Sequence, residues 1–165
     1  MIHCNNPLTY NELLKNPNSI FNRKDHKRAG IIPFSISEGI TYLLLGFSKE
    51  KKAVWADLGG RVEPGETVLE TALREFGEES RHVLPVDLNN IKNILVTGNF
   101  KQVIFFIQVS GDNYNINDLF QSTVPQSEYE DEMQFLQWIP YDTFLTLTNI
   151  SNSLRKIQKL LISLQ

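Results

Sequence analysis

The segment from Gly59 to Ser80, GGRVEPGETVLETALREFGEES, constrains the fold of this 165-residue chain more than any other stretch. It begins as a loop rich in glycine and proline and continues as a helix. Thr67 followed by Glu70 fits a capping box, so we expect the helix to begin at Thr67. Apolar residues recur along it at helical spacing and should face a sheet: Leu69, Ala72, Leu73 and Phe76.

Three glutamates lie beside this apolar stripe, where like charges at spacings of three and four repel one another. On a helical wheel Glu75, Glu78 and Glu79 fall within an arc of about 100°, at the border between core and solvent. The plain interpretation is a solvated acidic face. The alternative is a cation site, because a glycine-rich loop can bring backbone carbonyls close to a ligand. Converging hard oxygen atoms suit Mg²⁺ or Mn²⁺.

Apolar runs bounded by turn residues predict a sheet on both sides of this helix. The runs at 29–36 and 40–47 flank Glu38-Gly39, a pair typical of a hairpin turn. A short helix is expected near 10–15 and an amphipathic one at 153–165, with further strands at 53–58, 92–98, 101–110 and 132–140. Strands interleaved with helices indicate one mixed α/β domain.

Composition narrows the class of protein. The formal net charge of −3 argues against coating nucleic acid or an anionic membrane through bulk charge. Cys4 is the single cysteine, which excludes a disulfide framework and a cysteine-based zinc site. The first residues lack the pattern of a secretory signal, and no apolar run is long enough to span a membrane. We therefore expect a cytoplasmic protein with no membrane partner.

Residues 60–82 resemble the box of the Nudix hydrolases, G-x5-E-x7-R-E-U-x-E-E-x-G-U, in which U is a bulky apolar residue. Seven defined positions match in register: Gly60, Glu66, Arg74, Glu75, Phe76, Glu78 and Glu79. The resemblance implies an α/β/α sandwich with a mixed β-sheet. We assign residues 29–165 to this domain and expect residues 1–28 to be an extension packed on it.

The resemblance also implies a metal site that holds Mg²⁺ or Mn²⁺. By analogy Glu78 and Glu79 are metal ligands, together with the backbone carbonyl of Gly59. Glu75 is implied to be either a further ligand or the base that takes a proton from water, and its spacing alone does not distinguish the two.

Other residues of the box are implied to support catalysis or contact the substrate. Arg74 would orient a neighbouring glutamate, with Glu66 as its ion-pair partner. Gly60 and Glu66 would shape the box, and Gly60, Arg61 and Arg28 would contact substrate. Arg28 ends a basic cluster at 23–28 that could grip phosphates, although such a run is more often a solvated loop.

Many members of the family add a carboxylate from a loop after the box. The candidates here are Glu128, Glu130, Asp131 and Glu132. We favour Glu132 because it directly precedes the strand that carries Trp138. The plain interpretation, a solvated acidic loop, must hold for at least two of the four.

Two positions depart from the box. Arg81 stands where the box has glycine, which normally lets a helix end in the left-handed conformation. Either Arg81 is strained in that conformation, or the helix continues towards Leu84 and stops before Pro85. His82 replaces an apolar residue, and we expect it to pack or lie on the surface rather than touch substrate.

The resemblance implies hydrolysis of a nucleoside diphosphate linked to another moiety, a small-molecule substrate. Action on an RNA 5′ end or cap is an alternative, although the net charge does not indicate it. A non-catalytic nucleotide-binding module is a weaker one, because the chain keeps all four box glutamates. The sequence marks neither the exact substrate nor the oligomeric state, for which a dimer is one option.

Overall fold

The computed structural model describes residues 27–49, 53–97, 102–110 and 113–163. The helix expected near 10–15, Cys4 and nearly all of the 1–28 extension lie outside these residues. Seven strands are described: β1 (Arg28–Ser37), β2 (Ile40–Ser48), β3 (Trp55–Ala56), β4 (Leu58–Arg61), β5 (Ile91–Thr97), β6 (Gln102–Gln108) and β7 (Met133–Pro140).

The strands form one mixed sheet, as the sequence predicts. Its main path runs β3-β2-β1-β6-β5, with β4 paired to β1 and β7 paired to β2. The β1–β6 pair is parallel, whereas the other pairs are antiparallel. The predicted hairpin joins β1 to β2, and both of its turn residues have positive φ, 51° at Glu38 and 78° at Gly39. A pair of left-handed residues is what a tight hairpin requires.

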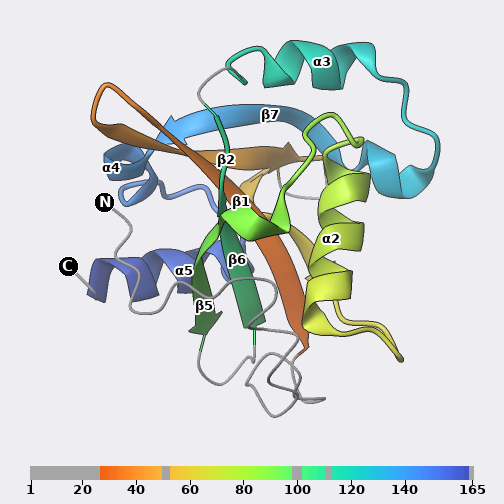
Figure 1. Ribbon diagram of the computed structural model, residues 1–165, viewed down its shortest axis with the longest axis horizontal. Coiled ribbons are helices and arrows are strands. Elements are labelled where there is room, and N and C mark those ends of the chain that lie inside the picture. Colours follow the sequence, from red (N-terminus) through yellow and green to blue (C-terminus); the bar gives the residue numbers. More distant parts are fainter. Residues whose placement is uncertain (1–26, 50–52, 98–101, 111–112, 164–165) are drawn as a thin grey trace.

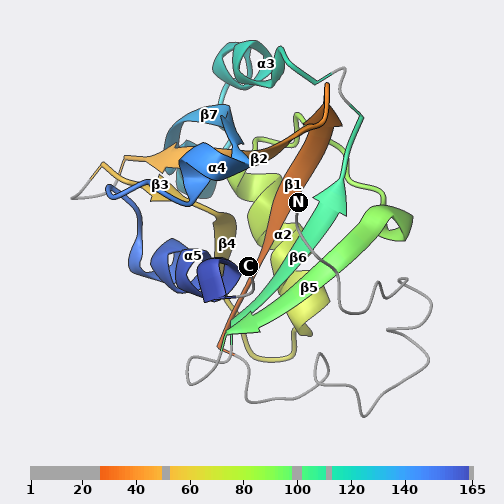
Figure 2. The same ribbon diagram turned by 90° about the vertical axis from the view of Figure 1, so that its left-hand side faces the viewer.

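Helices cover both faces of the sheet, which confirms the predicted sandwich. The helices in the described ranges are α2 (Val68–Glu79), α3 (Ile116–Ser122), α4 (Tyr141–Phe144) and α5 (Asn152–Ser163), with 3₁₀ turns η2 (Leu88–Asn90) and η3 (Glu128–Asp131). Figures 1 and 2 show α2 on one side of the sheet and α5 on the other, while α3 lies over β7. No helix among the described residues is long and apolar enough to cross a membrane.

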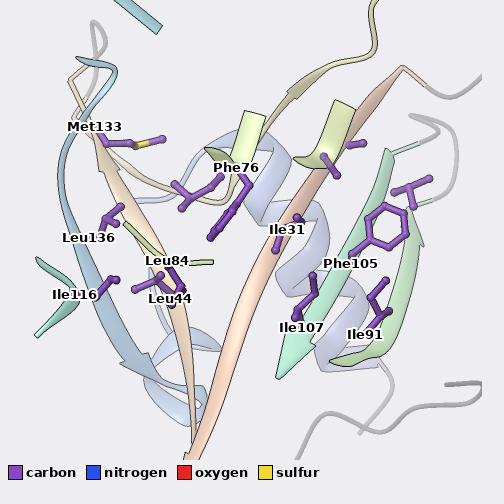
Figure 3. Packing of buried hydrophobic residues seen from close by; sticks show 14 of the residues in the cluster. Ile31, Leu44, Phe76, Leu84, Ile91, Phe105, Ile107, Ile116, Met133 and Leu136 are labelled. Carbon is purple, nitrogen blue, oxygen red and sulfur yellow. The ribbon is translucent and has the colours of Figure 1, made fainter. Parts of the chain in front are cut away.

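Each face of the sheet has its own hydrophobic core. On the α2 side, Phe76 of the helix packs among Ile31, Leu44 and Phe105 of the strands (Figure 3). On the α5 side, buried residues of the helix pack on the opposite face of the same strands, and they are Leu154, Ile157 and Leu161. Successive strand side chains point to opposite faces, so β1, β2 and β6 contribute to both cores.

Two parts of the fold differ from the prediction. The strand expected at 53–58 is two short strands, β3 and β4, and Gly59-Gly60 belongs to β4 rather than ending a strand. These glycines pair with Gly30 and Ala29 of β1, where an added side chain would collide. Helix α3 and the short α4 were not predicted, because their apolar residues are too few to establish a period.

Candidate active site

Helix α2 begins as the sequence predicts. The Thr67 hydroxyl accepts a hydrogen bond from the Glu70 amide, and the Glu70 carboxylate accepts one from the Thr67 amide, which completes the capping box. Ala72 and Phe76 are buried against the sheet, and Leu69 and Leu73 pack at the edge of the same core. The stripe fixes the rotation of the helix, so the last turn points its glutamates towards β4 and the start of β7.

Arg74 holds the glutamates of the helix and the loop together. Its Nε and Nη2 donate to the two carboxylate oxygens of Glu66 at 2.8 and 3.0 Å, the predicted ion pair. Its Nη1 donates to Glu75 at 2.9 Å and lies 3.5 Å from Glu78. The hydrogen bonds from Arg74 lower the pKa of Glu66 to about 2. Arg74 therefore links the box loop to two of the three clustered carboxylates.

We expect Glu66→Gln to lower the free energy of unfolding by about 1–2 kcal/mol at pH 7, less than the full pKa shift would give because the pair is partly exposed. The pKa of Glu66 is lower in the folded state than in the unfolded state, so its contribution is complete above about pH 4.5 and is lost as the pH falls towards about 2. Urea unfolding of both proteins from pH 7 to pH 3 should show that the difference in their free energies of unfolding becomes smaller as the pH falls.

The matched control is Glu63→Gln, because Glu63 is exposed and lies 3.9 Å from the same guanidinium. It should change the free energy of unfolding by less than about 0.5 kcal/mol. An equal loss of unfolding free energy in the two variants would contradict a specific Glu66–Arg74 pair. A loss in Glu66→Gln that does not depend on pH would contradict it as well.

Glu79 is buried more deeply than the sequence predicts. It is only 5% exposed, and its Oε2 atom is buried without a hydrogen-bond partner among the described residues. Burial, the charge of Asp57 and a hydrogen bond with Glu132 raise the pKa of Glu79 well above its ordinary range. Burial and Glu75 also raise the pKa of Glu78. Without a cation, Glu78 and Glu79 therefore bind a proton more readily than a solvent-exposed glutamate does.

The glycines of β4 let these carboxylates approach the sheet. A Cβ atom on Gly60 would overlap the carboxylate of Glu75. One on Gly59 would lie 2.7 Å from the Ala29 carbonyl oxygen and 2.8 Å from Oδ2 of Asp57. The structure therefore places both predicted glycines in contact with the acidic cluster.

Among the late-loop candidates, the structure brings Glu132 to the cluster. It lies within hydrogen-bonding reach of Glu79 and close enough to Glu78 to raise its pKa. Asp131 instead pairs with Lys49 at 2.6 Å, and this lowers the pKa of Asp131. Glu128 is exposed, and the Glu130 carboxylate lies 3.5 Å from the Gln126 amide.

A cavity of about 590 Å³ adjoins this cluster where β1, β4, β6 and α5 meet. The cavity is lined by four cationic side chains, those of Lys27, Arg28, Arg61 and Lys156, together with Val62, Gln102 and Ser153. Among the described residues, no carboxylate lines it. Its size suits a small organic ligand. The predicted substrate residues Arg28 and Arg61 thus share one cavity.

Arg28 connects the cavity to the acidic cluster. Its Nη1 donates to Asp57 at 2.7 Å and to Gln102 at 2.6 Å. Burial alone would lower the pKa of Arg28, but the charge of Asp57, the hydrogen bond to it and the charges of Glu79 and Glu75 together outweigh burial, and the pKa is raised. The Asp57 side chain is fully buried, and its Oδ1 has no hydrogen-bond partner in the described chain. The sequence does not single out Asp57 or Lys156, because nothing in the local pattern separates them from ordinary strand and helix residues.

The donors present fit a hard divalent cation. Two buried carboxylate oxygens, on Asp57 and Glu79, have no hydrogen-bond partner among the residues that the structure describes. Glu75 and Glu132 lie close enough to Glu79 and Glu78 to raise their pKa values, and they add further carboxylate oxygens. Carboxylate oxygens are the preferred ligands of Mg²⁺ and Mn²⁺. Within the described ranges, no three such side chains already stand in the arrangement of a bound metal.

The end of α2 resolves the two departures from the box. The helix ends at Glu79 and does not continue towards Leu84, and Arg81 takes the left-handed conformation with φ of 53°. His82 follows with φ of 56°, and its exposed imidazole packs against Gly77 rather than facing the cluster.

Comparison with known proteins agrees with this geometry. A model of the NUDIX domain family matches residues 24–161. Among solved structures, a Nudix hydrolase from M. smegmatis, RenU, is 18% identical with a TM-score of 0.61, and 84% of each chain is covered. A C. elegans Ap4A hydrolase in a binary complex is 19% identical with a TM-score of 0.50, over 84% of this chain and 98% of that one.

NrtR of Shewanella oneidensis is 16% identical with a TM-score of 0.55, over 80% of this chain and 60% of its own. At these identities the likeness concerns the fold. No curated protein matches the chain by sequence. The family match spans most of the chain and contains the full set of box glutamates, so this protein belongs to the NUDIX domain family and is a Nudix-type pyrophosphohydrolase.

Proposed function

We propose that this protein is a Mg²⁺- or Mn²⁺-dependent hydrolase of a nucleoside diphosphate linked to another moiety. The observation that carries the proposal is the buried acidic cluster around Glu79 beside a cavity lined by four cations. The cluster suits a divalent cation, and the cavity suits an anionic, phosphate-bearing ligand. A metal site alone would not explain the four cations, and an anion site alone would not explain the buried carboxylates.

The carboxylates of the cluster would have two roles, holding a cation and accepting a proton. Glu78, Glu79 and the Gly59 carbonyl would hold the cation, with Glu75 as a further ligand or as the base. A divalent cation, when bound, offsets the charge of the carboxylates and polarises the phosphate oxygens. Water attacks one phosphorus atom, the P–O bond to the bridging oxygen breaks, and a carboxylate of the cluster takes the proton from the water.

The cationic cavity would bind the rest of the substrate. Arg61 is exposed at its rim, whereas Arg28 is anchored by Asp57 and Gln102 and can donate from a fixed position. Arg74 does not line this cavity, and its contacts with Glu66 and Glu75 support a role in orienting the carboxylates.

An RNA 5′ end is the second candidate substrate. Lys27 and Arg28 end the basic cluster at 23–28, and both line the cavity, so a longer polyanion could follow that cluster. The small-molecule substrate is preferred because the cavity has the volume of a nucleoside-sized site.

A substrate panel with Mg²⁺ tests the proposal. We expect wild type to hydrolyse at least one class among nucleoside diphosphate sugars, dinucleoside polyphosphates, and capped or triphosphorylated RNA. A chelator should abolish the activity and added Mg²⁺ should restore it, because the carboxylates alone repel a pyrophosphate. Product masses from a reaction in ¹⁸O-labelled water identify the phosphorus atom that is attacked.

A Glu79→Gln protein purified in parallel reports any contaminating phosphatase. Hydrolysis that survives thorough chelation would contradict the metal dependence. If wild type hydrolyses no compound of the panel, the proposed substrate class is wrong. Preference for RNA over every small nucleotide would favour the second candidate.

A further inference from the structure

Arg81 ends the box helix in a conformation that glycine adopts more easily. Its φ of 53° lies in the left-handed region, and the His82 amide bonds back to the Gly77 carbonyl at 2.9 Å, as at a helix end closed by glycine. A side chain at this position is unfavourable unless the surroundings compensate for it. The backbone therefore does not explain why an arginine stands here.

The side chain of Arg81 makes four hydrogen bonds and contacts one aromatic ring within the described part of the chain. Its Nε donates to the Glu130 carbonyl at 2.8 Å, and Nη2 pairs with the Asp131 carboxylate at 3.2 Å. Its Nη1 donates to the carbonyls of Phe120 at 3.2 Å and Thr123 at 3.1 Å, and the guanidinium lies 4.0 Å above the Phe120 ring. The side chain is only 7% exposed. The planar guanidinium can meet these acceptors together, which a lysine ammonium cannot do.

These contacts hold the segment that leads to Glu132. Phe120 and Thr123 lie at the end of α3, and Glu130 and Asp131 belong to η3, immediately before Glu132. Figure 1 shows η3 beside the C-terminal end of α2. Glu132 in turn reaches Glu79, two residues before Arg81. One side chain thus joins the end of the box helix to the loop that brings a further carboxylate, that of Glu132, to the same cluster.

We propose that Arg81 is a positioning residue for catalysis, which holds the segment 120–131 so that Glu132 lies against Glu79. The inference rests on the proposed function, in which Glu132 belongs to the reacting cluster. Arg81 touches neither the substrate cavity nor the reacting atoms, and it acts through Glu132. Lys49 supports the other side of the segment, since its amide donates to the Glu132 carbonyl at 2.9 Å.

A double-mutant cycle separates this role from a general effect on folding. Arg81→Gly removes the guanidinium and relieves the left-handed backbone, and it is made both in wild type and in Glu132→Gln. We expect kcat to fall at least tenfold in the first background and less than twofold in the second, because Glu132 is already lost there. KM should change less than threefold, since the cationic cavity is untouched. Arg81→Lys keeps the charge but loses most of the hydrogen bonds, so its kcat should lie between those of wild type and Arg81→Gly.

Hydrogen exchange gives a readout that needs no activity. Amides of residues 124–132 should exchange at least tenfold faster in Arg81→Gly, whereas those of residues 68–76 should not change. Arg155→Ala is the control, because Arg155 is exposed and donates to the Thr148 carbonyl, far from the segment that Arg81 contacts. It should leave both kcat and exchange unchanged.

Equal loss of kcat in the two backgrounds, or unchanged exchange at 124–132, would overturn the positioning role. Wild-type protein without hydrolytic activity would instead overturn the proposed function. In that case the exchange measurement still decides whether Arg81 holds the segment.

Discussion

Glu79→Gln is expected to lower kcat at least 100-fold while leaving the metal-free protein as stable as wild type or slightly more stable. Removing a catalytic or metal-binding group commonly costs about 10²–10⁴ in rate. Stability should not suffer, because the wild-type carboxyl is buried with one unpartnered oxygen beside Asp57, Glu75 and Glu132. In the metal-free protein this carboxyl either repels its neighbours, at about 0.2–0.5 kcal/mol for each exposed like-charged pair and more when buried, or binds a proton as its raised pKa favours. The neutral amide avoids both costs.

Thermal melts with and without Mg²⁺ measure the predicted stabilities of wild type and Glu79→Gln. At tenfold excess over its dissociation constant, Mg²⁺ should stabilise wild type by about 1.4 kcal/mol and the variant much less. Glu38→Gln is the control, since Glu38 is exposed in the β1–β2 hairpin. A variant that is clearly destabilised without metal, yet responds to Mg²⁺ like wild type, would make Glu79 a structural residue.

Glu132→Gln should lower kcat tenfold or more with little change in KM. Glu132 lies at the cluster through its contact with Glu79, and it is not among the residues that line the cationic cavity. An amide keeps the shape of the side chain but can neither accept a proton nor bind a cation as a carboxylate does. Steady-state kinetics of the purified variant at saturating Mg²⁺ measures the effect.

The matched control is Glu128→Gln, four residues earlier on the same loop and exposed. It should retain wild-type kcat. A near-normal Glu132→Gln together with an inactive Glu128→Gln or Glu130→Gln would show that another carboxylate of this loop serves the site.

The structure reproduces the parts of the site whose residues lie close together in the sequence. The capping box fixes the start of α2, and the spacing of Ala72 and Phe76 fixes which face is buried. The Glu66–Arg74 pair needs only a short loop and two helical turns, and it forms as predicted. The choice of Glu132 among the late-loop carboxylates follows from its position immediately before a recognisable strand.

Other features depend on strands and helices that are distant in the sequence. The burial of Glu79 results from the packing of α2 against β1 and β4, beside Asp57, which immediately precedes β4. The cationic cavity combines Arg28 of β1, Arg61 of β4 and Lys156 of α5, which no local pattern relates. Sequence periodicity shows which face of an element is apolar, but not which polar residues of other elements meet it.

The sequence by itself therefore determined the family, the mixed sheet between two helices and the clustered glutamates, because periodicity and capping act over a few residues. Only the tertiary structure decided that the helix ends at Glu79 with Arg81 in the left-handed conformation, and that the guanidinium then contacts the loop before Glu132. The physical reason is that a left-handed arginine is unfavourable on its own. It is stable here because carbonyls some 40–50 residues further along the chain accept its hydrogen bonds.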